Sequence, residues 1–476
     1  MDNILNLALE AWRGGAELRR RRLRYKQYTY GNQWADIITT PHGKVMSEGD
    51  YARKSGMRPL TNNMIRQLVK CVIGNFRSSL RDDADTAAAL CAVDTEIATR
   101  NNLTELDCRM LEEFLISGCA IQRVVSERRM AGAGTWIDNI SPDRFFINRF
   151  CDPRGLDIEL TGMLHDLSLR EMLLRFGGGD KARTDRIAAI YAEIASRGTD
   201  TPIGDGVATE FFTAPDGRCR VIEIWTLESR NIVKCHDPET AEYYILPADS
   251  ITAVTTANQS RATAGKRAIT TRPRTTMRWH CRFMTPTGEV LQEYDSPYPH
   301  GMHPFVIKFY PLTDGEVHSF VEDIIDQQRY INRLITLIDH IMSVSAKGVL
   351  LFPIDQKPDC YTWEEIGRLW AHCNSIIPYE RGRCDGEPKQ VIASGESAGA
   401  YQLLNLQMQL FQQISGVSGA LQGHLSSNNT SAALYDSQVR TSAIAILDIL
   451  DSYNAFRLQR NRLVNYTQSP AATPYP

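Results

Sequence analysis

The pattern of apolar and polar residues changes most sharply between residues 397 and 435, where thirty-nine consecutive positions hold no Asp, Glu, Lys or Arg. At the chain's 23% charged residues, roughly nine would be expected in a soluble domain. Apolar residues at helical spacing predict a helix at the start of this stretch, which Gly416 and Gly419 end. Thr430 or Ser431 then caps a second helix. An uncharged face of Gln and Asn suits a wall that packs against copies of itself, or one past which a polyanion moves without binding.

The first 118 residues carry apolar residues at the spacing of helices. They predict helices over residues 1–30, from Thr61 to Gly74, over about 85–101 and over about 104–118. The first of these contains a run of five arginines between Arg19 and Arg24, which favours a solvated face over a specific contact with a polyanion.

From Cys119 onward, short β-branched and aromatic runs bounded by Gly and Pro predict strands. The runs are CAIQRVVSERR (119–129), TWIDNISP (135–142), RFFINRF (144–150), RCRVIEIWTLESRNIV (218–233), TMRWHCRFMTPTGEVLQEYD (276–295) with a hairpin turn at 285–288, and HPFVIKFYP (303–311) followed by a turn at 313–315. Helices are predicted at about 168–176 and 181–197. Loops are predicted at 198–216 and at 253–275, the second of which we expect to order on assembly.

The strongest helical pattern runs from Ser319 to Lys347, with Ser319 and Glu322 as a capping box and Gly348 as a stop. About 29 residues at 1.5 Å each give a helix of roughly 43 Å. Residues 348–394 predict short strands (GVLLFP, SIIPY and KQVI) around one helix that contains Trp363, and the last helix covers about 431–466. The predicted fold class is α+β.

Composition narrows the function classes. A net charge of −3 and a pI near 6.4 give no support to a nucleic-acid coat protein, although DNA can pass through a neutral or acidic channel. Eleven scattered cysteines without a C-x-x-C pair indicate reduced, mostly buried thiols in a cytoplasmic compartment. No segment has the apolar length of a membrane span.

One catalytic motif occurs, Gly395-Glu396-Ser397-Ala398-Gly399, which matches the G-x-S-x-G nucleophile elbow of serine hydrolases. That fold requires an acid and then a histidine after the serine. The first acid after Ser397 is Asp436, and the only later histidine, His424, precedes it. A serine esterase that uses Ser397 is therefore kept only as an alternative, and a helix start capped by Ser394 or Ser397 is favoured.

Phosphate and metal motifs are also weak. Residues 264–267 lack the first Gly and the Ser or Thr of a P-loop, and the glycines at 177–179 are explained by a helix end. His280, Cys281, His300, His303 and the pair 372–373 have no metal-ligand spacing. Acids near the start of the long helix suit the helix dipole and offer only a weak ion site.

The order of the motifs resembles the portal proteins (head-to-tail connectors) of tailed bacteriophages over most of the chain. The motifs are GNQW, LTNNMIRQLVKCVIGNF, LISGCAIQRV, NISPDRFFIN, CDPRGLD, HPFVIKFYP, VEDIIDQQRYINRLIT and GVSGALQGHLSSNNTSAALYDSQ before a long helix. The resemblance implies an α/β wing (1–313), a first stem helix (314–347), a small α/β clip (348–394), a second stem helix (395–415), a tunnel loop (416–430) and a long helix with a short crown and disordered tail (431–476).

The resemblance also implies the residues of the channel. In the tunnel loop they are Gly416, Val417, Ser418, Gly419, Gln422, His424, Ser426, Ser427, Asn428 and Asn429. In the stem they are Glu322, Asp323, Asp326, Arg329, Arg333, Gln402, Gln409 and Gln413. In the clip, possible contacts with terminase or adaptor are Arg368, Arg381, Arg383 and Lys389.

Such proteins form rings, typically of twelve subunits, at one capsid vertex, and DNA enters and leaves the capsid through the ring. The implied partners are further copies of the chain, double-stranded DNA, the terminase large subunit, the major capsid protein and head-to-tail adaptor or neck proteins. No membrane, cofactor, metal or catalytic residue is implied, and the location is the virion after assembly in the host cytoplasm. A neck or adaptor protein is the other structural alternative, but such proteins are usually much shorter and lack the paired long helices.

Overall fold

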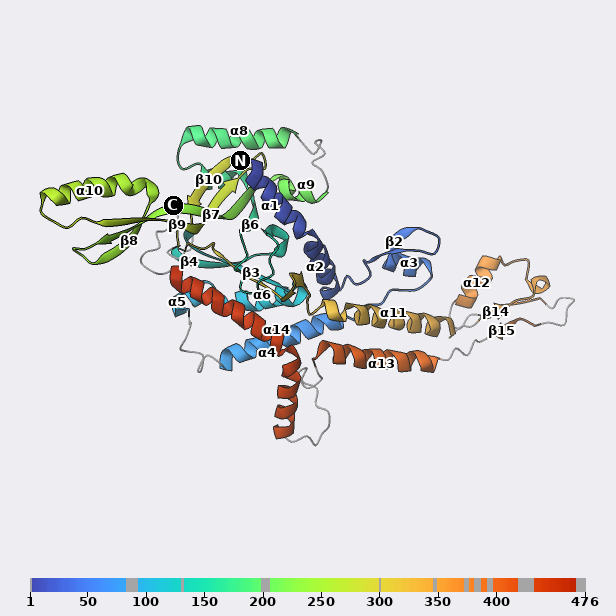
Figure 1. The fold of residues 1–476 in the computed structure, drawn as a ribbon. Coiled ribbons are helices and arrows are strands. Elements are labelled where there is room, and N and C mark those ends of the chain that lie inside the picture. The colour runs from blue at the N-terminus through green and yellow to red at the C-terminus, as the bar shows by residue number, and fades with distance from the viewer. Residues whose placement is uncertain are drawn as a thin grey trace. The chain divides into compact units, whose positions relative to one another are not determined.

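The computed structural model describes residues 2–82, 93–129, 132–197, 206–298, 301–345, 349–371, 376–380, 387–391, 397–417 and 432–467. Helices and strands are both abundant (Figure 1), as the predicted α+β class requires. The chain divides into two compact units. Unit 1 comprises Met1–Leu23, Ile73–Ser319 and Leu447–Pro476, and unit 2 comprises Arg24–Val72 and Phe320–Ile446. Three helices contain a boundary between the units: α2 (Ala16–Thr29), α4 (Met64–Asp82) and α14 (Ala432–Thr467).

Unit 1 is built on an antiparallel sheet of six strands in the order β10-β9-β7-β6-β5, with β8 paired to the outer half of β7. Its strands are β5 (Phe145–Ile147), β6 (Leu160–Leu167), β7 (Cys219–Asp237), β8 (Glu242–Pro247), β9 (Thr270–Met284) and β10 (Val290–Asp295). The predicted hairpin turn at 285–288 connects β9 to β10, where the Thr285 backbone amide donates to the Glu289 carbonyl. Strand β6 was not predicted, because seven of its eight residues are buried without a simple alternation.

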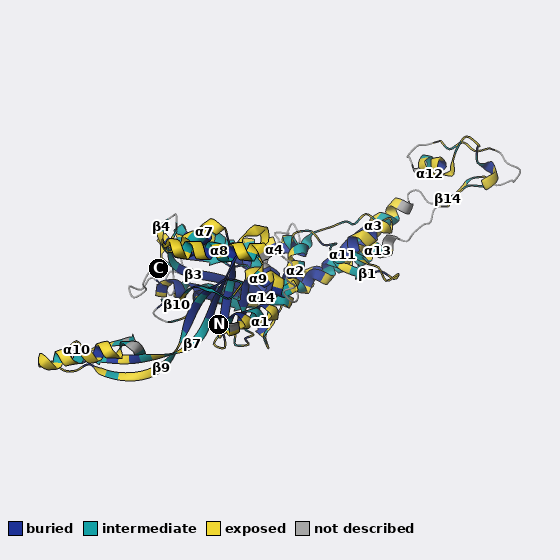
Figure 2. Ribbon diagram, turned by 90° about the horizontal axis from the view of Figure 1, so that it is seen from above, coloured by how far each residue is buried: buried dark blue, intermediate teal, exposed yellow. Residues whose placement is uncertain are grey.

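Alternate residues of β7 enter two different cores, as the period of a strand requires. Ile222 and Ile224 pack with helices α1 (Asp2–Gly14) and α9 (Gly206–Phe212). Val221 and Trp225 pack instead with α7 (Leu169–Phe176) and α8 (Lys181–Arg197). Both faces of this inner part of the sheet are therefore covered, and Figure 2 shows the inner part of β7 buried. Helices α7 and α8 confirm the predicted bounds, whereas α9 lies within the stretch predicted as a loop at 198–216.

A second sheet of unit 1 has three strands in the order β11-β3-β4, namely β11 (Phe305–Phe309), β3 (Cys119–Arg129) and β4 (Gly132–Asn139). Helix α6 (Leu103–Ser117), preceded by α5 (Thr95–Arg100), leads directly into β3. It ends at Gly118, whose φ of +72° is a left-handed conformation that glycine adopts at low cost. After β11, the predicted turn at 313–315 connects β12 (Pro311–Thr313) to β13 (Glu316–Val317).

The unit 1 part of α14 packs against α6 through buried aromatic rings. Tyr453 and Phe456 are fully buried, and the Tyr453 ring lies 5.7 Å from that of Phe114. Asp107 of α6 is 2% exposed and accepts from Arg457 at 3.1 Å and from Arg460. Because Arg460 is itself 1% exposed, this is a buried ion pair between two helices.

The outer half of β7, strand β8, helix α10 (Ile251–Thr263) and the first half of β9 form an arm, residues 230–276. The prediction of a loop at 253–275 is therefore wrong, since α10 and β9 occupy most of it. Only Val254 of α10 is buried. A helix with one buried residue gives no amphipathic period, which explains why the sequence pattern did not show it.

Unit 2 contains the long helix α11 (Glu322–Ser345) and the helix α13 (Ser397–Ser415), which lie side by side. Between them in sequence are β14 (Val349–Leu351), α12 (Trp363–Ala371) and β15 (Lys389–Val391), and β14 pairs with β15. The unit also includes β1 (Ile37–Thr39), β2 (Val45–Ser47) and α3 (Glu48–Lys54). The predicted SIIPY strand (375–379) is wrong for residues 376–379, which are neither helix nor strand.

Three predicted helix bounds are corrected. The single helix predicted over residues 1–30 is two helices, α1 and α2, separated at Gly15. The helix α4 continues past Gly74 to Asp82, because Gly74 does not adopt the positive φ that ends a helix at glycine. The helix α11 begins at Glu322, so Ser319 lies two residues before its N-cap position. The predicted stop at Gly348 and the predicted disordered tail beyond Thr467 lie outside the described residues.

Candidate functional site

The helix pair α11–α13 holds all the candidate stem residues. Tyr401 near the start of α13 donates to the sulfur of Met342 near the end of α11 at 3.1 Å. Gln407 of α13 lies beside the middle of α11, where Tyr330 is placed. The two helices therefore run antiparallel.

One face of α11 carries three buried polar residues, Gln328, Asn332 and Thr336, at 0%, 2% and 2% exposure. Their spacing of four residues places them on one face of the helix. They bind the backbone of residues 60–65, the segment that leads into α4. The Gln328 side-chain oxygen accepts from Met64 N at 3.0 Å, Asn332 Oδ1 accepts from Asn62 N at 3.1 Å, and Thr336 Oγ1 accepts from Leu60 N at 3.0 Å.

Gln328 of this row satisfies the first two backbone amides of α4, those of Met64 and Ile65, which have no partner inside the helix. Gln328 Nε2 also donates to the Asn62 carbonyl at 2.7 Å, and Asn332 Nδ2 donates to Gln33 Oε1 at 2.6 Å. Two of the motifs that carry the family resemblance, LTNNM and DQQRYINRLIT, are thus joined by hydrogen bonds. The buried residues of these motifs therefore hold α11 against residues 60–65.

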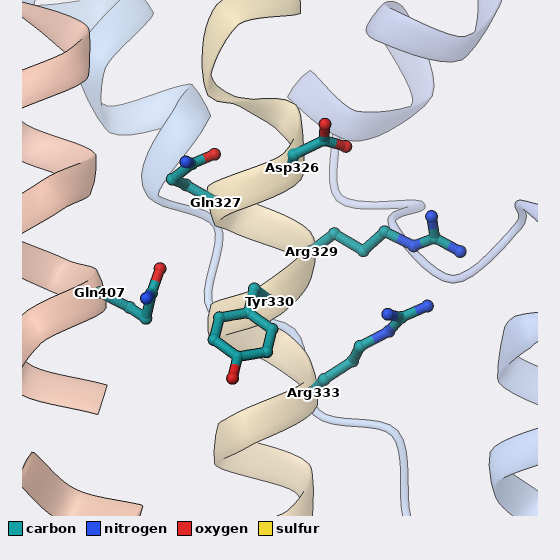
Figure 3. Close-up of a pocket in the computed structure, with 6 residues that line it drawn as sticks. All are labelled: Asp326, Gln327, Arg329, Tyr330, Arg333 and Gln407. Atoms are coloured by element: carbon teal, nitrogen blue, oxygen red, sulfur yellow. The ribbon is translucent and has the colours of Figure 1, made fainter. Parts of the chain in front are cut away.

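A neighbouring face of α11 binds Glu48, the first residue of α3. Glu48 is 5% exposed and accepts from Arg329 at 2.7 Å and also from Arg333. Although partial burial acts against it, the hydrogen bond and negative charge of Glu48 raise the pKa of Arg329 above its ordinary value. Figure 3 shows both arginines extending away from α13.

A second carboxylate, Asp36, holds the chain before β1. It accepts from Arg24 at 2.8 Å and from the Tyr28 hydroxyl at 2.8 Å. Despite its burial, the hydrogen bonds from Arg24 and Tyr28 lower the pKa of Asp36. Burial and the contact with Asp36 together raise the pKa of Tyr28, which stays a neutral donor at physiological pH.

We predict that Glu48→Gln loosens α3 from α11. The amide keeps the shape but removes the charge that two arginines share, at an expected cost of about 1–3 kcal/mol. Amide hydrogen exchange in residues 48–54 should become faster. Glu364→Gln, at an exposed position of the same unit, is the matched control and should leave that exchange unchanged. Equal protection in wild type and Glu48→Gln would show that the ion pairs contribute nothing.

A shallow hollow of about 330 Å³ lies between the two helices (Figure 3) and is lined by Asp326, Gln327, Arg329, Tyr330, Arg333 and Gln407. Two of its side chains, Arg329 and Arg333, are already occupied by Glu48. Asp326 and Asp323 are exposed, and Glu322 is partly exposed. Among the described residues, no three His, Cys, Asp or Glu side chains come together as a metal site.

The face of α13 with Gln402, Gln409 and Gln413 is exposed along its length. Large apolar side chains are exposed beside these glutamines: Tyr401 at 42%, Leu406 at 49% and Ile414 at 45%. On α11, exposed apolar residues are Tyr330 at 39%, Leu337 at 43% and Met342 at 54%. The helix pair therefore carries apolar surface that its own unit does not cover.

At the end of α13, Gly416 adopts a φ of +64° and stops the helix, as predicted. Val417 is fully buried, and its backbone amide donates to Ser415 Oγ at 3.3 Å. The remaining candidate loop residues, Ser418 to Asn429, lie outside the described residues.

In residues 349–391, Arg368 of α12 and Lys389 of β15 are exposed, whereas Arg381 and Arg383 lie outside the described ranges. Helix α12 begins with a capping box that the sequence analysis missed: the Glu365 amide donates to Thr362 Oγ1 at 3.2 Å, and the Thr362 amide donates to Glu365 Oε2 at 2.8 Å. Ile354 and Ile376 are 84% and 86% exposed, so this segment also carries uncovered apolar surface.

The arginine run from Arg19 to Arg24 is neither a solvated face nor a free polyanion site. The Arg19 guanidinium lies 3.4 Å from the Trp12 ring centroid, and Arg22 is 3% exposed between Glu113 and Asp143. Of the five arginines, only Arg20 is fully exposed, and it pairs with Glu17 at 2.6 Å. The run is therefore structural.

Other candidates from the sequence have structural explanations in the described residues. His280 bonds to Asp295 at 2.6 Å, and the His303 ring packs 4.7 Å from that of Trp279. The described cysteines are free. Within the described ranges, no helix combines the length and the apolar character needed to cross a bilayer.

A comparison with known protein families identifies the class of this protein: it is a phage portal protein, a structural protein of the virion. The matching family is described as phage P22-like portal protein, and the match covers residues 7–465. The chain therefore belongs to the phage P22-like portal protein family. A search of the curated proteins found none that matches it. The family is structural, so the comparison gives no support to an esterase that uses Ser397, the first residue of α13.

Proposed function

We propose that the chain forms a dodecameric ring at one vertex of the capsid, and that the ring is the channel for packaging and ejecting DNA. The observation that carries this proposal is the uncharged, exposed face of α13, together with membership of the portal family. In this assignment α11 and α13 are the stem helices and residues 348–394 are the clip.

The exposed apolar residues of the helix pair support assembly with further copies. A closed ring repeats one heterologous contact, so each subunit must present two complementary surfaces. Leu406, Ile414 and Leu337 are 43–49% exposed in the single chain. Covering them in a neighbour's contact removes apolar area from water at about 25 cal/mol per Å².

The neutral glutamine face supports a channel through which DNA moves. Lysine or arginine on a channel wall releases counterions from each phosphate that it neutralises and so binds the DNA. The face with Gln402, Gln409 and Gln413 provides no such cation. In the proposed ring the three glutamines lie toward the DNA path, whereas Leu406 contacts the neighbouring copy. The loop from Gly416 to Thr430 narrows the path.

The proposed partners at the clip end are the terminase large subunit during packaging and adaptor or neck proteins afterwards, and the major capsid protein contacts the wing. Arg368 and Lys389 are the exposed cations of the clip that are available for these contacts.

The test is the mass of the assembly in solution, with negative-stain images of the same sample. A chain of 53.6 kDa should give particles of roughly 640 kDa with a central hole, if twelve copies close into a ring. A sample that stays monomeric in the presence of capsid and scaffold components would contradict the proposal.

We predict that Gly416→Val impairs DNA packaging while rings still form. The φ of +64° is strained by roughly 1–2 kcal/mol for a residue with a β-carbon, so the start of the loop shifts. Packaged DNA per particle should fall, and Gly399→Val, near the exposed start of α13 with open space around it, is the control. Wild-type packaging by Gly416→Val would contradict the role of the loop.

A further inference from the structure

The arm of unit 1 presents a strongly cationic face that no other described part of the chain covers. Residues 230–276 contain seven Lys and Arg against four Asp and Glu, whereas the whole chain has a net charge of −3. Lys234 of β7 and Arg272 and Arg274 of β9 are all exposed. No hydrogen bond or ion pair joins these three side chains to another described residue. We name them the cationic face.

The strand register places the three cations together. Lys234 lies directly opposite Arg272, and Arg274 follows two residues later on the same face of the sheet. Like charges directly opposite each other on adjacent strands are destabilising. Among the described strand positions of this face beyond Arg230, no Asp or Glu is present to relieve the repulsion. A bound polyanion would supply the counter-charge that the described strand positions of this face lack.

The opposite face of the arm is closed, so the cationic face is held in place. Val233, Cys235, Val254 and Ile269 form a small core under α10. Asn258 of α10 fixes the start of β9 by accepting from Ile269 N at 2.7 Å and donating to its carbonyl at 3.0 Å. Arg261 of α10 pairs with Asp237 of β7. Figure 2 shows α10 along one side of the exposed outer part of β9.

The surrounding groups suit phosphate better than an acidic protein. Thr270 lies on the same face and is exposed, and hydroxyls together with Arg and Lys are the usual donors to DNA phosphates. Tyr243 is 79% exposed and stacks on His236 at 4.3 Å, so its hydroxyl adds a further donor at the edge of the face. A protein partner would instead need a buried apolar or aromatic anchor pocket at its centre. The centre of this face is the Lys234–Arg272 pair.

We propose that the cationic face binds the phosphate backbone of double-stranded DNA without sequence preference. The cationic face belongs to unit 1, and the neutral face of α13 belongs to unit 2. Because fixed cations bind phosphates, the cationic face retains DNA, whereas the neutral face of α13 lets DNA slide. The choice of DNA as the polyanion rests on the proposed portal function, because that function puts this protein in contact with the packaged genome.

The test uses the full-length protein and a covalently closed DNA minicircle, which has no end to enter a channel. We expect the triple variant Lys234→Gln, Arg272→Gln, Arg274→Gln to bind the minicircle at least ten-fold more weakly than wild type. For this variant, the slope of the logarithm of the binding constant against the logarithm of the salt concentration should decrease in magnitude by about 3, one for each lost phosphate contact. The control variant Lys44→Gln, Arg170→Gln, Lys181→Gln removes three exposed cations elsewhere and should bind as wild type does.

The particle mass of each sample separates the two proposals. If no rings form even with capsid and scaffold components present, the portal assembly fails as a proposal, and the binding comparison still tests the cationic face. Equal affinity of wild type and the arm variant, or equal losses in the arm and control variants, would overturn the inference. Displacement of the minicircle by polyglutamate at lower concentration than by linear duplex DNA would also overturn it and assign the face to an acidic protein.

Discussion

Replacing Leu406 by glutamate is expected to abolish ring assembly while the chain stays folded. Leu406 is 49% exposed on α13, so half of its side chain is free for a neighbouring copy. Burying a carboxylate without a partner at such a contact costs several kcal/mol, and the loss of leucine adds about 1 kcal/mol. Because the same contact repeats at every interface of a ring, the penalty recurs with each added subunit.

Native mass spectrometry of the Leu406→Glu protein should show monomers where wild type gives rings, with a melting midpoint close to that of wild type. Leu174→Glu places the same change at an 86% exposed leucine on α7 and serves as the matched control. Rings of full mass from Leu406→Glu would show that this face of α13 is not an interface between copies. The neutral face would then have to be explained by the DNA path alone.

Replacing Asp107 by alanine is expected to destabilise unit 1 by roughly 3–5 kcal/mol, the usual cost of removing one member of a buried ion pair. The change leaves Arg460, at 1% exposure, without its carboxylate partner and removes the partner of Arg457. Arg457 keeps its position 5.2 Å from the Phe76 ring centroid, so most of the loss comes from Arg460.

Calorimetry of the full chain should show a lower midpoint for Asp107→Ala, and hydrogen exchange should locate the loss in α6 and in residues 453–464 of α14. Asp451→Ala removes an exposed carboxylate from the same helix and should change neither measurement. An unchanged midpoint for Asp107→Ala would mean that the apolar contacts of Tyr453 and Phe456 hold α14 without the ion pair.

Much of the fold could be predicted because apolar periodicity matched burial. Helices α7, α8, α11, α13 and α14, strands β3, β7 and β9, and the turn at 285–288 all follow from it. Elements were missed where the apolar periodicity does not follow burial. Strand β6 is buried on both faces and contains Gly162, where an added β-carbon would lie 2.2 Å from the Glu223 carbonyl oxygen. Helix α10 buries only one residue, so nothing periodic marks it.

The candidate site was only partly visible in the sequence. The uncharged face of α13 is a local property, and thirty-nine residues without charge display it directly. Glu48 gave no signal, because its partners Arg329 and Arg333 are 281 and 285 positions away. A sequence signal was present for the buried polar row of α11, because Gln328, Asn332 and Thr336 recur at helical spacing beside the apolar stripe. The arginine run was misinterpreted, because three of its five members have partners outside the run. Arg19 contacts Trp12, Arg22 pairs with Glu113 and Asp143, and Arg24 pairs with Asp36.

The hydrogen bonds between α11 and residues 60–65 set an order for folding during synthesis. The paired residues are 264 to 276 positions apart, so residues 24–72 leave the ribosome long before α11 exists. At about 5–20 residues per second, that interval is roughly 15 to 50 s. Until α11 is synthesised, the backbone amides of residues 60–65 are hydrogen-bonded to water. The chain segment that closes when these residues bind α11 is among the longest in the protein. During that interval the N-terminal part of unit 2 is accessible to chaperones and proteases. The supply of assembly-competent subunits therefore depends on how much of it stays intact until α11 is synthesised.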